Sequence, residues 1–481
     1  MQMAATDNGE RKRRTLSPFK PIFANGRSSC LHGNDALLRN SLVDVAISRR
    51  AQLKELGFSV ITFLLLFFSW NELITWNWAR INQICRSTTV YEASPTIPSN
   101  TGEMDWKKCE SYFLGADPLE YELYFRRFPG SLPDFIGQIS DARARQTLLV
   151  EIHKRPLFGP LTALATSIVG TLSGLPHPER MHAVLALYAS ICSLLLFRLL
   201  RWAGSSIALA LCATTVATAS FSWLSVFSIP ESYSLSVAAT IIAARSGMSL
   251  SRATERHEEW AIVAHSLVIG IASWLYLPAC GALFFGLSPF PRRPKALRVP
   301  LTLGVSICAL ALSPQLILGG FAQVATQMDY GMQWGSISNL LDLDIWLEVI
   351  AAFLVFSIVA PADHALTIPG TVQWYAVHSL PVIASAACVI ASYILLIRSA
   401  TLRGMQLRDL VGPAFWLISL LTFHVIFNPR EVLLYTSPPL VLIVLMASLI
   451  IKQIHLPPRT ILPIGLCIAG ALAAVNLRAL T

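Results

Sequence analysis

Repeated stretches of about 20 mostly apolar residues constrain the fold of this chain more than any other feature. A helix of that length spans the hydrocarbon core of a bilayer with every backbone polar group paired inside it. Only 14% of the 481 residues are charged and 54% are hydrophobic, whereas a soluble domain is about 25% charged. The composition excludes a set of soluble domains, a disordered or collagen-like chain and a disulfide scaffold. It predicts an all-α polytopic membrane protein.

The apolar segments predict where the helices lie. We expect them at 56–76, 157–175, 181–200, 205–224, 231–247, 261–287, 299–319, 346–360, 376–397, 411–427, 432–451 and 460–478. We expect 157–175 to lie along the membrane face, and 346–360 to pack at or into the membrane without crossing it. The long stretch 261–287 predicts two short helices that bend near Pro278. Together the segments predict about eleven transmembrane helices.

The distribution of Lys and Arg predicts the orientation, because cytoplasmic connections are enriched in these residues. Basic clusters lie in 1–55 and around Arg198, Arg245, Arg292, Arg398 and Lys452. Residues 320–375 have no Lys or Arg but several Asp and Glu. We expect the basic clusters inside and 320–375 outside, with the N-terminus cytoplasmic and the C-terminus outside.

This orientation predicts the domain organisation. Residues 1–55 form a basic cytoplasmic tail that sets orientation or touches anionic lipid, and nucleic acid is not an expected partner. Residues 56–480 form the transmembrane domain. It includes a large external loop at 77–180 and an external or re-entrant segment at 320–375. Because these two segments are outside, we expect the working face to be the outer one.

Cysteines and short motifs carry little further information. Cys85 and Cys109 share one polar segment and would pair only if it faces an oxidising compartment. The sequence has no CxxC, Walker, GxSxG, HExxH or GxGxxG pattern in a supporting context. Asp342-Leu343-Asp344 resembles the metal-binding pair of soluble sugar-nucleotide transferases, so a divalent cation is a possible cofactor, although no further ligand is placed by the sequence.

Two candidate functional groups precede the second apolar segment. Glu72, at the expected outer end of the first helix, is either a base or metal ligand or a marker of the interface among neighbouring tryptophans. His153, Lys154 and Arg155 precede Pro156, which suits the first turn of a helix. A helix N-terminus with Lys and Arg binds phosphate well, but the same cations also suit simple interfacial anchoring.

Two further candidates lie at expected outer helix ends. Glu231 follows Pro230 in the first turn of a helix, with Tyr233 close behind; the position suits the helix dipole alone, or the carboxylate is functional. Arg430 and Glu431 lie in a turn between two expected spans, with Tyr435 after them. They neutralise each other, or Arg430 holds an anionic ligand.

These features resemble the GT-C class of membrane glycosyltransferases, especially the family of protein O-mannosyltransferases and bacterial lipid-A aminoarabinose transferases. The resemblance covers roughly 56–450, mainly as architecture. Residues 153–157 resemble the family's His-Lys-Pro-Pro-Leu segment, with Arg155 in place of the first Pro. Pro230-Glu231 resembles the acidic start of a later helix, and 428–435 resembles an outer-turn motif of glycosyltransferase-like bacterial proteins.

The resemblance implies a mechanism. Relatives usually place an Asp or Asp-Glu just after the first helix as catalytic base, where this chain has Glu72; Asp105, Asp117 and Glu120 are alternatives. The carboxylate would deprotonate an acceptor hydroxyl, which attacks the anomeric carbon of a polyprenyl-phosphate sugar. Lys154, Arg155 or Arg430 would stabilise the departing phosphate.

The resemblance also implies binding partners, and two alternative functions stay open. The implied partners are the donor lipid, a lipid, glycan or protein acceptor, and the bilayer. The outer compartment is a periplasm or an ER lumen, and a bacterial inner membrane is favoured. A secondary transporter is the main alternative function, although no internal repeat is visible. A non-catalytic protein of GT-C-like architecture is the other.

Overall fold

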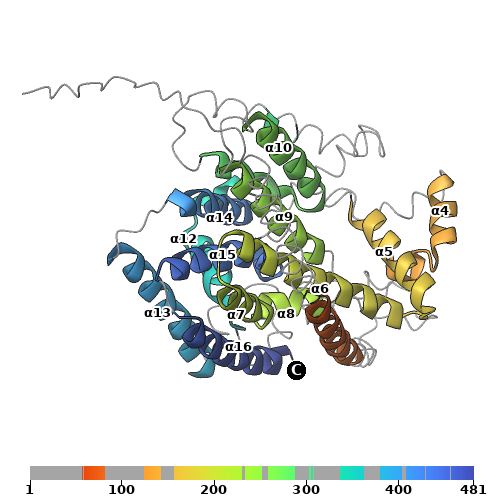
Figure 1. Ribbon diagram of the computed structural model, residues 1–481, viewed down its shortest axis with the longest axis horizontal. Coiled ribbons are helices and arrows are strands. Elements are labelled where there is room, and N and C mark those ends of the chain that lie inside the picture. Colours follow the sequence, from red (N-terminus) through yellow and green to blue (C-terminus); the bar gives the residue numbers. More distant parts are fainter. Residues whose placement is uncertain are drawn as a thin grey trace, which may run out of the picture. The chain divides into compact units, whose positions relative to one another are not determined.

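A computed structural model describes residues 57, 59–81, 124–141, 157–229, 233–251, 258–287, 303, 304, 307, 336–361, 380–402, 408–427, 429–454 and 457–480. The chain divides into two compact units, Met1–Val60 and Ile61–Thr481. About 89% of the described residues are helical, and none of them is in a strand. This confirms the predicted all-α class (Figure 1).

Five helices are long and apolar enough to cross a membrane: Ser59–Ile81, α6 (Glu179–Trp202), α14 (Arg408–Ile426, with the span at Asp409–Ile426), α15 (Ser437–Ile454) and α16 (Pro458–Leu480). A sixth span exists if α7 (Ile207–Thr218) and α8 (Phe221–Ser228), which are bent by 62°, count as one. These are the helices of a membrane-embedded protein. Among the described ranges, eleven spans are not shown, and most of the expected segment 299–319 lies outside them.

The remaining helices are shorter or less apolar. They include α4 (Leu132–Ser140), α5 (Phe158–Ser173), α9 (Tyr233–Ser251), α10 (Glu258–Leu275), η2 (Leu277–Leu287), η3 (Ile337–Leu341), α12 (Leu343–Ala351), η4 (Ala352–Phe356), α13 (Leu380–Leu402) and η7 (Pro429–Tyr435). Of these, η2, η3 and η7 are 3-10 helices and η4 is a π-helix. The predicted division of 261–287 into two helices near Pro278 is found, because α10 ends at Leu275 and η2 begins at Leu277.

Local sequence sets several helix ends. Ser206 begins α7, and its hydroxyl accepts a hydrogen bond from Leu209 N at 3.2 Å. This satisfies one of the N–H groups that a helix start leaves without an intrahelical partner. Gly174 ends α5 in the left-handed conformation with φ 64°, which a glycine adopts without steric cost.

At one end of the bundle, several helix termini meet beside basic residues. Lys452 of α15 donates to Ala203 O at the end of α6, at 3.2 Å. Cys212 of α7 donates to Ile461 O, in the first turn of α16, at 3.0 Å. We call this the basic end, because α6 carries Arg198 and Arg201 there and α15 carries Lys452.

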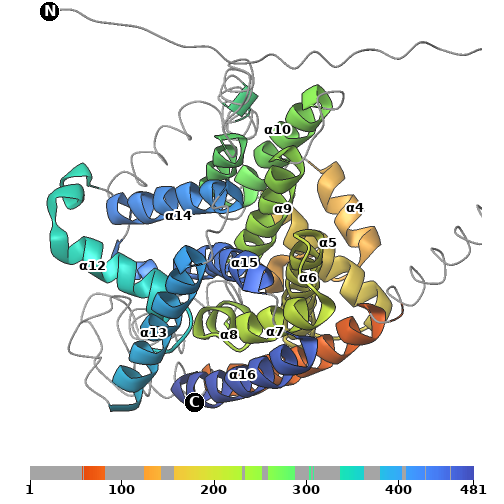
Figure 2. The same cartoon turned by 60° about the vertical axis from the view of Figure 1, so that its left-hand side comes forward.

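The opposite termini of α15 and α16 also meet other helices. Ser437, which opens α15, donates to Ser222 O of α8 at 2.9 Å. Arg80, near the end of helix Ser59–Ile81, donates to Leu480 O at the end of α16. We call this the far end. Figure 2 shows α15, α16 and α8 from a second side.

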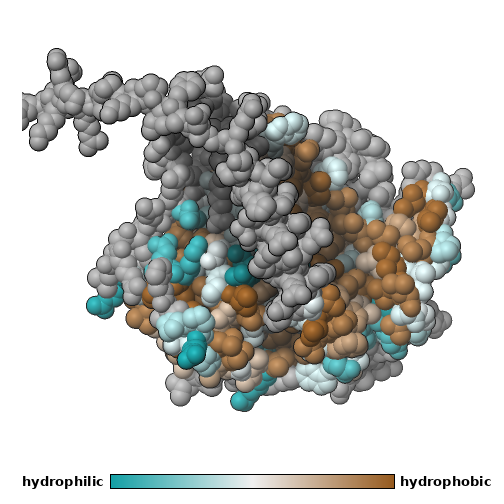
Figure 3. Space-filling model, viewed as in Figure 1, coloured by the Kyte–Doolittle hydropathy of each residue, from teal (hydrophilic) through white to brown (hydrophobic). Residues whose placement is uncertain are grey.

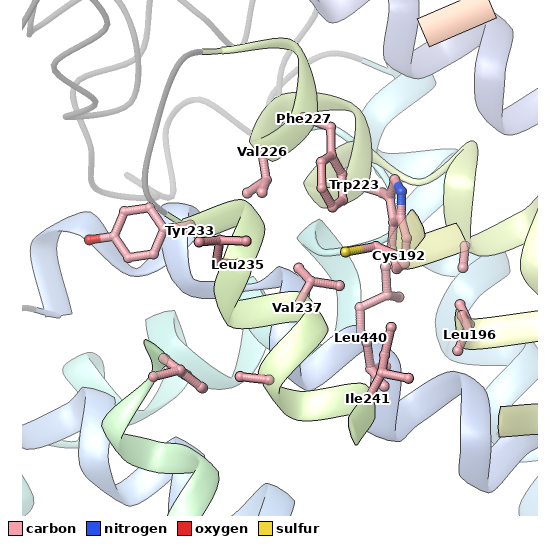
Figure 4. Close-up of a cluster of buried hydrophobic side chains, with 14 of the residues drawn as sticks. Cys192, Leu196, Trp223, Val226, Phe227, Tyr233, Leu235, Val237, Ile241 and Leu440 are labelled. Carbon is pink, nitrogen blue, oxygen red and sulfur yellow. The ribbon is translucent and has the colours of Figure 1, made fainter. Parts of the chain in front are cut away.

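The buried core joins α6, α8, α9 and α15. Figure 4 shows Trp223 and Phe227 of α8 beside Cys192 of α6 and Leu440 of α15. Outside this core, apolar side chains stay exposed on α13 and α16, for example Ile394 at 59% and Leu466 at 52%. Figure 3 shows such apolar residues over much of the coloured face in view. Exposed apolar surface on long helices is what contact with lipid requires.

Candidate functional site

Polar and aromatic side chains gather near the far end. Ser437 lies 15 residues before Lys452 of the basic end, which is about 22 Å along a helix. A bilayer's hydrocarbon core is about 30 Å thick. The distance of about 22 Å between Ser437 and the basic end is shorter than this thickness.

His424, in the last turn of α14, is the centre of this group of side chains. Its side chain is 1% exposed. The Tyr435 ring stacks on it with centroids 4.6 Å apart, and Phe353 meets it edge-on at 5.4 Å. Tyr276 Oη lies 3.3 Å from His424 Nε2, within hydrogen-bond distance. We call His424, Tyr276, Phe353, Tyr435 and Tyr233 the His424 cluster.

Three of the rings around His424 belong to, or adjoin, helices that are not ordinary α-helices. Tyr276 comes directly before the 3-10 helix η2, Phe353 lies in the π-helix η4, and Tyr435 ends the 3-10 helix η7. Short 3-10 and π segments are frequent at hinges and functional sites. Three of them meet on one buried histidine here.

The two ring nitrogens of His424 differ in their surroundings. Nε2 faces Tyr276, whereas Nδ1 is buried and has no hydrogen-bond partner among the described residues. His265 of α10 is a useful comparison, because it is buried to a similar extent and both nitrogens are engaged. Its Nδ1 lies 2.9 Å from Ser246 Oγ, and its Nε2 lies 3.2 Å from Ala282 O.

Two of the candidate segments identified in the sequence come together at the His424 cluster. Tyr233, at the start of α9, meets Tyr435 edge-on with centroids 4.8 Å apart. Figure 4 shows Tyr233 at the margin of the apolar core with its hydroxyl pointing away from it. Arg430 and Glu431 lie in η7, although their side chains are outside the described part of the chain. Glu231 is also outside it.

Glu72 lies on a different surface. The face of helix Ser59–Ile81 that packs on the bundle carries Trp70, Ile74 and Asn77, all buried. Asn77 donates to Ser228 Oγ of α8 at 3.0 Å. Glu72 lies on the opposite face of this helix and is exposed, so the described residues do not bring it to the His424 cluster.

Other sequence candidates lie outside the described residues. These are Asp105, Asp117, Glu120, His153, Lys154, Arg155 and the pair Cys85 and Cys109. The structure therefore tests neither their roles nor the pairing of the two cysteines.

The Asp342-Leu343-Asp344 motif has a structural role at the start of α12. Asp342 Oδ1 accepts hydrogen bonds from Asp344 N at 2.9 Å and Ile345 N at 3.4 Å, as an N-cap does. Among the described residues, no group of three or more His, Cys, Asp or Glu side chains is placed to hold a metal ion. Burial raises the pKa of the nearby Glu348 carboxyl, and the negative charges of Asp344 and Asp342 add to this shift.

Sequence reasoning missed His424. It is a single polar residue near the end of an apolar segment, and its contacts come from residues 276, 353 and 435. The only available signal was an ionisable residue within an expected span, which by default indicates a functional site.

Comparisons with known proteins assign no relative. No protein-family model matches the chain, and no curated protein matches it.

Proposed function

We propose that this protein is a membrane glycosyltransferase of the GT-C type, which moves a sugar from polyprenyl phosphate to an acceptor at the outer face. The observation that carries the proposal is the contact between Tyr233 and Tyr435. It joins the start of α9 to the turn η7, and sequence reasoning had singled out both segments independently as parts of an outer site. Glu231 precedes Tyr233 by two residues, and Arg430 and Glu431 precede Tyr435 within η7.

The proposed topology has about eleven spans, with the basic end in the cytoplasm. It is supported by the meeting of the α6 and α15 C-termini, which carry Arg201 and Lys452, at one end of the bundle. The His424 cluster lies near the other end. In this orientation, the cluster faces the periplasm or lumen, where polyprenyl-phosphate sugars are used by the enzymes that the sequence resembles.

The proposed reaction displaces polyprenyl phosphate by an acceptor hydroxyl. The acceptor oxygen forms a bond to the anomeric carbon, the bond from that carbon to the phosphate oxygen breaks, and a carboxylate takes the hydroxyl proton. Arg430, with Lys154 and Arg155, neutralises the departing phosphate. Glu72, Asp105 and Asp117 are the candidate bases. Glu72 is exposed on the face of its helix that does not pack on the bundle. A donor or acceptor would therefore approach it from the surface of the bundle.

A transfer assay tests this proposal. Purified protein in nanodiscs would receive radiolabelled polyprenyl-phosphate sugars and membrane extract as acceptor. We expect transfer by the wild type, a loss of at least about 100-fold for the variant of the true base among Glu72→Gln, Asp105→Asn and Asp117→Asn, and full activity for Glu179→Gln, an exposed carboxylate of α6. No transfer from any donor would reject the enzyme.

Sidedness is tested separately with single cysteines in a Cys-depleted background. We expect positions 153, 231 and 430 to react with an impermeant thiol reagent from outside. Cysteines at 245 and 459, near the basic end, should react only after permeabilisation. Labelling of 231 from the cytoplasm alone would reject the shared outer site.

One observation favours a second candidate function, secondary transport. The α7–α8 pair bends by 62° within the membrane-embedded part of the chain, and broken helices often build transporter binding sites. Uptake by proteoliposomes under a proton or sodium gradient would support transport. A non-catalytic protein of the same architecture would show neither transfer nor uptake.

A further inference from the structure

His424 has a chemical feature that a purely structural residue would not need. A buried polar atom without a hydrogen-bond partner is costly, and native structures contain few of them. The imidazole is 1% exposed, yet its Nδ1 has no partner in the described part of the chain. A phenylalanine would fill similar space and keep the ring stacking without leaving this nitrogen buried.

The surroundings of His424 fit a ligand that has both hydroxyl groups and an apolar face. Ligand sites are mostly apolar and aromatic, with a few placed polar groups. Here Phe353 and Tyr435 supply aromatic surfaces at 5.4 and 4.6 Å from the imidazole, and Nδ1 supplies the polar group. A sugar ring has hydroxyls for the nitrogen and C–H faces for the aromatic rings.

The structure also indicates how a ligand would reach His424. Tyr435 is only half-buried, and it stands between His424 and Tyr233 at the end of η7. Because η7 is a seven-residue 3-10 helix, with poorer hydrogen-bond geometry than an α-helix, its end can repack more easily than the spans around it. A shift of Tyr435 would open the imidazole to a ligand from the far end.

We propose that the His424 cluster is the sugar subsite of the protein, in which His424 Nδ1 forms a hydrogen bond with a sugar hydroxyl while Tyr435 and Phe353 cover the apolar face of the sugar. This inference rests on the proposed function. It adds His424, Tyr276 and Phe353 to the candidate residues, with Tyr276 as a positioning residue that holds Nε2 and thereby directs Nδ1.

The test compares two buried histidines. His424→Phe removes the nitrogen that has no partner, and His265→Phe removes one whose two nitrogens face Ser246 and Ala282. We expect the thermal midpoint in detergent to be equal to or above that of the wild type for His424→Phe, and to be lower for His265→Phe. A fall for His424→Phe as large as that for His265→Phe would overturn the inference, whatever the ligand experiments give.

The second readout is binding of polyprenyl-phosphate hexoses and pentoses to protein in nanodiscs, with polyprenyl phosphate alone as reference. We expect His424→Phe to weaken binding of one sugar donor by about tenfold, as for the loss of about one hydrogen bond, and to leave binding of polyprenyl phosphate unchanged. His265→Phe should leave both unchanged in the folded fraction.

The outcomes separate the inference from the proposed function. Donor binding that is equal in the wild type and His424→Phe overturns the subsite and leaves the transferase standing. An equal loss of sugar donor and polyprenyl phosphate indicates contact with the lipid phosphate and also overturns it. If the wild type binds polyprenyl phosphate but gains nothing from any sugar, the sugar subsite is wrong. If the wild type binds neither polyprenyl phosphate nor any sugar donor, the proposed transferase function is wrong, and the sugar subsite is wrong with it.

Discussion

The side-chain amide of Asn476 holds the break between α7 and α8. Asn476, fully buried in α16, donates from Nδ2 to Ala219 O and to Ile358 O, both at 2.8 Å, and its Oδ1 accepts from Ala360 N at 2.9 Å. Backbone groups freed by a bend at membrane depth must find partners inside the protein. One residue of the last helix thus supplies partners to two irregular segments that are distant in sequence.

Replacement of Asn476 by Leu should destabilise the fold strongly. Ile358 O retains its bond from Phe221 N, but Ala219 O and Ala360 N lose the bonds made by Asn476. Each buried group left unpaired costs about 1–3 kcal/mol, so we expect a total of about 3 kcal/mol. Denaturant unfolding in micelles measures this. Thr460→Leu, at an exposed position of the same helix, should unfold like the wild type. Equal stability of Asn476→Leu would show that these bonds contribute little.

Two glycines of α16 should respond in opposite ways to alanine. A Cβ on Gly465 would overlap Cys212 Sγ of α7, whereas a Cβ on Gly470 would meet nothing within 4 Å. Alanine is favoured over glycine inside a helix by about 1 kcal/mol. We expect Gly470→Ala to be neutral or stabilising, and Gly465→Ala to lower stability by about 1–3 kcal/mol, as overpacking does. The thermal midpoints of the two variants test this prediction. Equal midpoints would contradict close packing of α7 on α16.

The sequence predicted elements that depend on local signals. The break near Pro278 follows from proline chemistry, and the helices predicted at 181–200 and 432–451 follow from their apolar length, although the second begins only at Ser437, after η7. The segment 205–224 is predicted as one helix, but it breaks at Ala219–Ser220, where there is neither Pro nor Gly. This break depends on Asn476 and Ile358, so a local reading could not find it.

The candidate site was also predictable only where its residues carry local sequence signals. Tyr233 and Tyr435 each lie in a segment with a visible signal, a proline-led helix start and a charged turn, and the structure brings these residues into contact. His424 has no such local signal. Its significance comes from three rings contributed by different elements, and from a nitrogen whose lack of a partner among the described residues is visible only after folding.

Glu348 should make the stability of the α12 region depend on pH. Burial, with Asp344 and Asp342, raises the pKa of its carboxyl in the folded protein. A raised pKa means that proton binding stabilises the fold below the ordinary carboxyl pKa of about 4.3, and that this contribution is lost as pH rises through the raised value. We therefore expect Glu348→Gln to raise the thermal midpoint at pH 7 and to change it little at pH 4.

A suitable control for this experiment removes a carboxylate whose charge is favourable. Glu179 is exposed in the first turn of α6, where a negative charge interacts well with the helix dipole. Glu179→Gln should therefore give no gain at pH 7. A midpoint for Glu348→Gln that falls at pH 7, or that rises equally at pH 4 and pH 7, would contradict a raised pKa at Glu348.

The last prediction concerns α13 and the hydroxyl of Tyr393, which joins it to η4. None of its described side chains is buried, and Tyr393 Oη donates to Leu354 O of η4 at 2.9 Å. Tyr393→Phe should increase hydrogen exchange in α13 by about fivefold, as expected for the loss of about 1 kcal/mol, with little change in α6. Ser392→Ala is the matched control, because the Ser392 hydroxyl bonds Cys388 O within its own helix. Unchanged exchange in Tyr393→Phe would mean that the apolar contacts of α13 hold it without this bond.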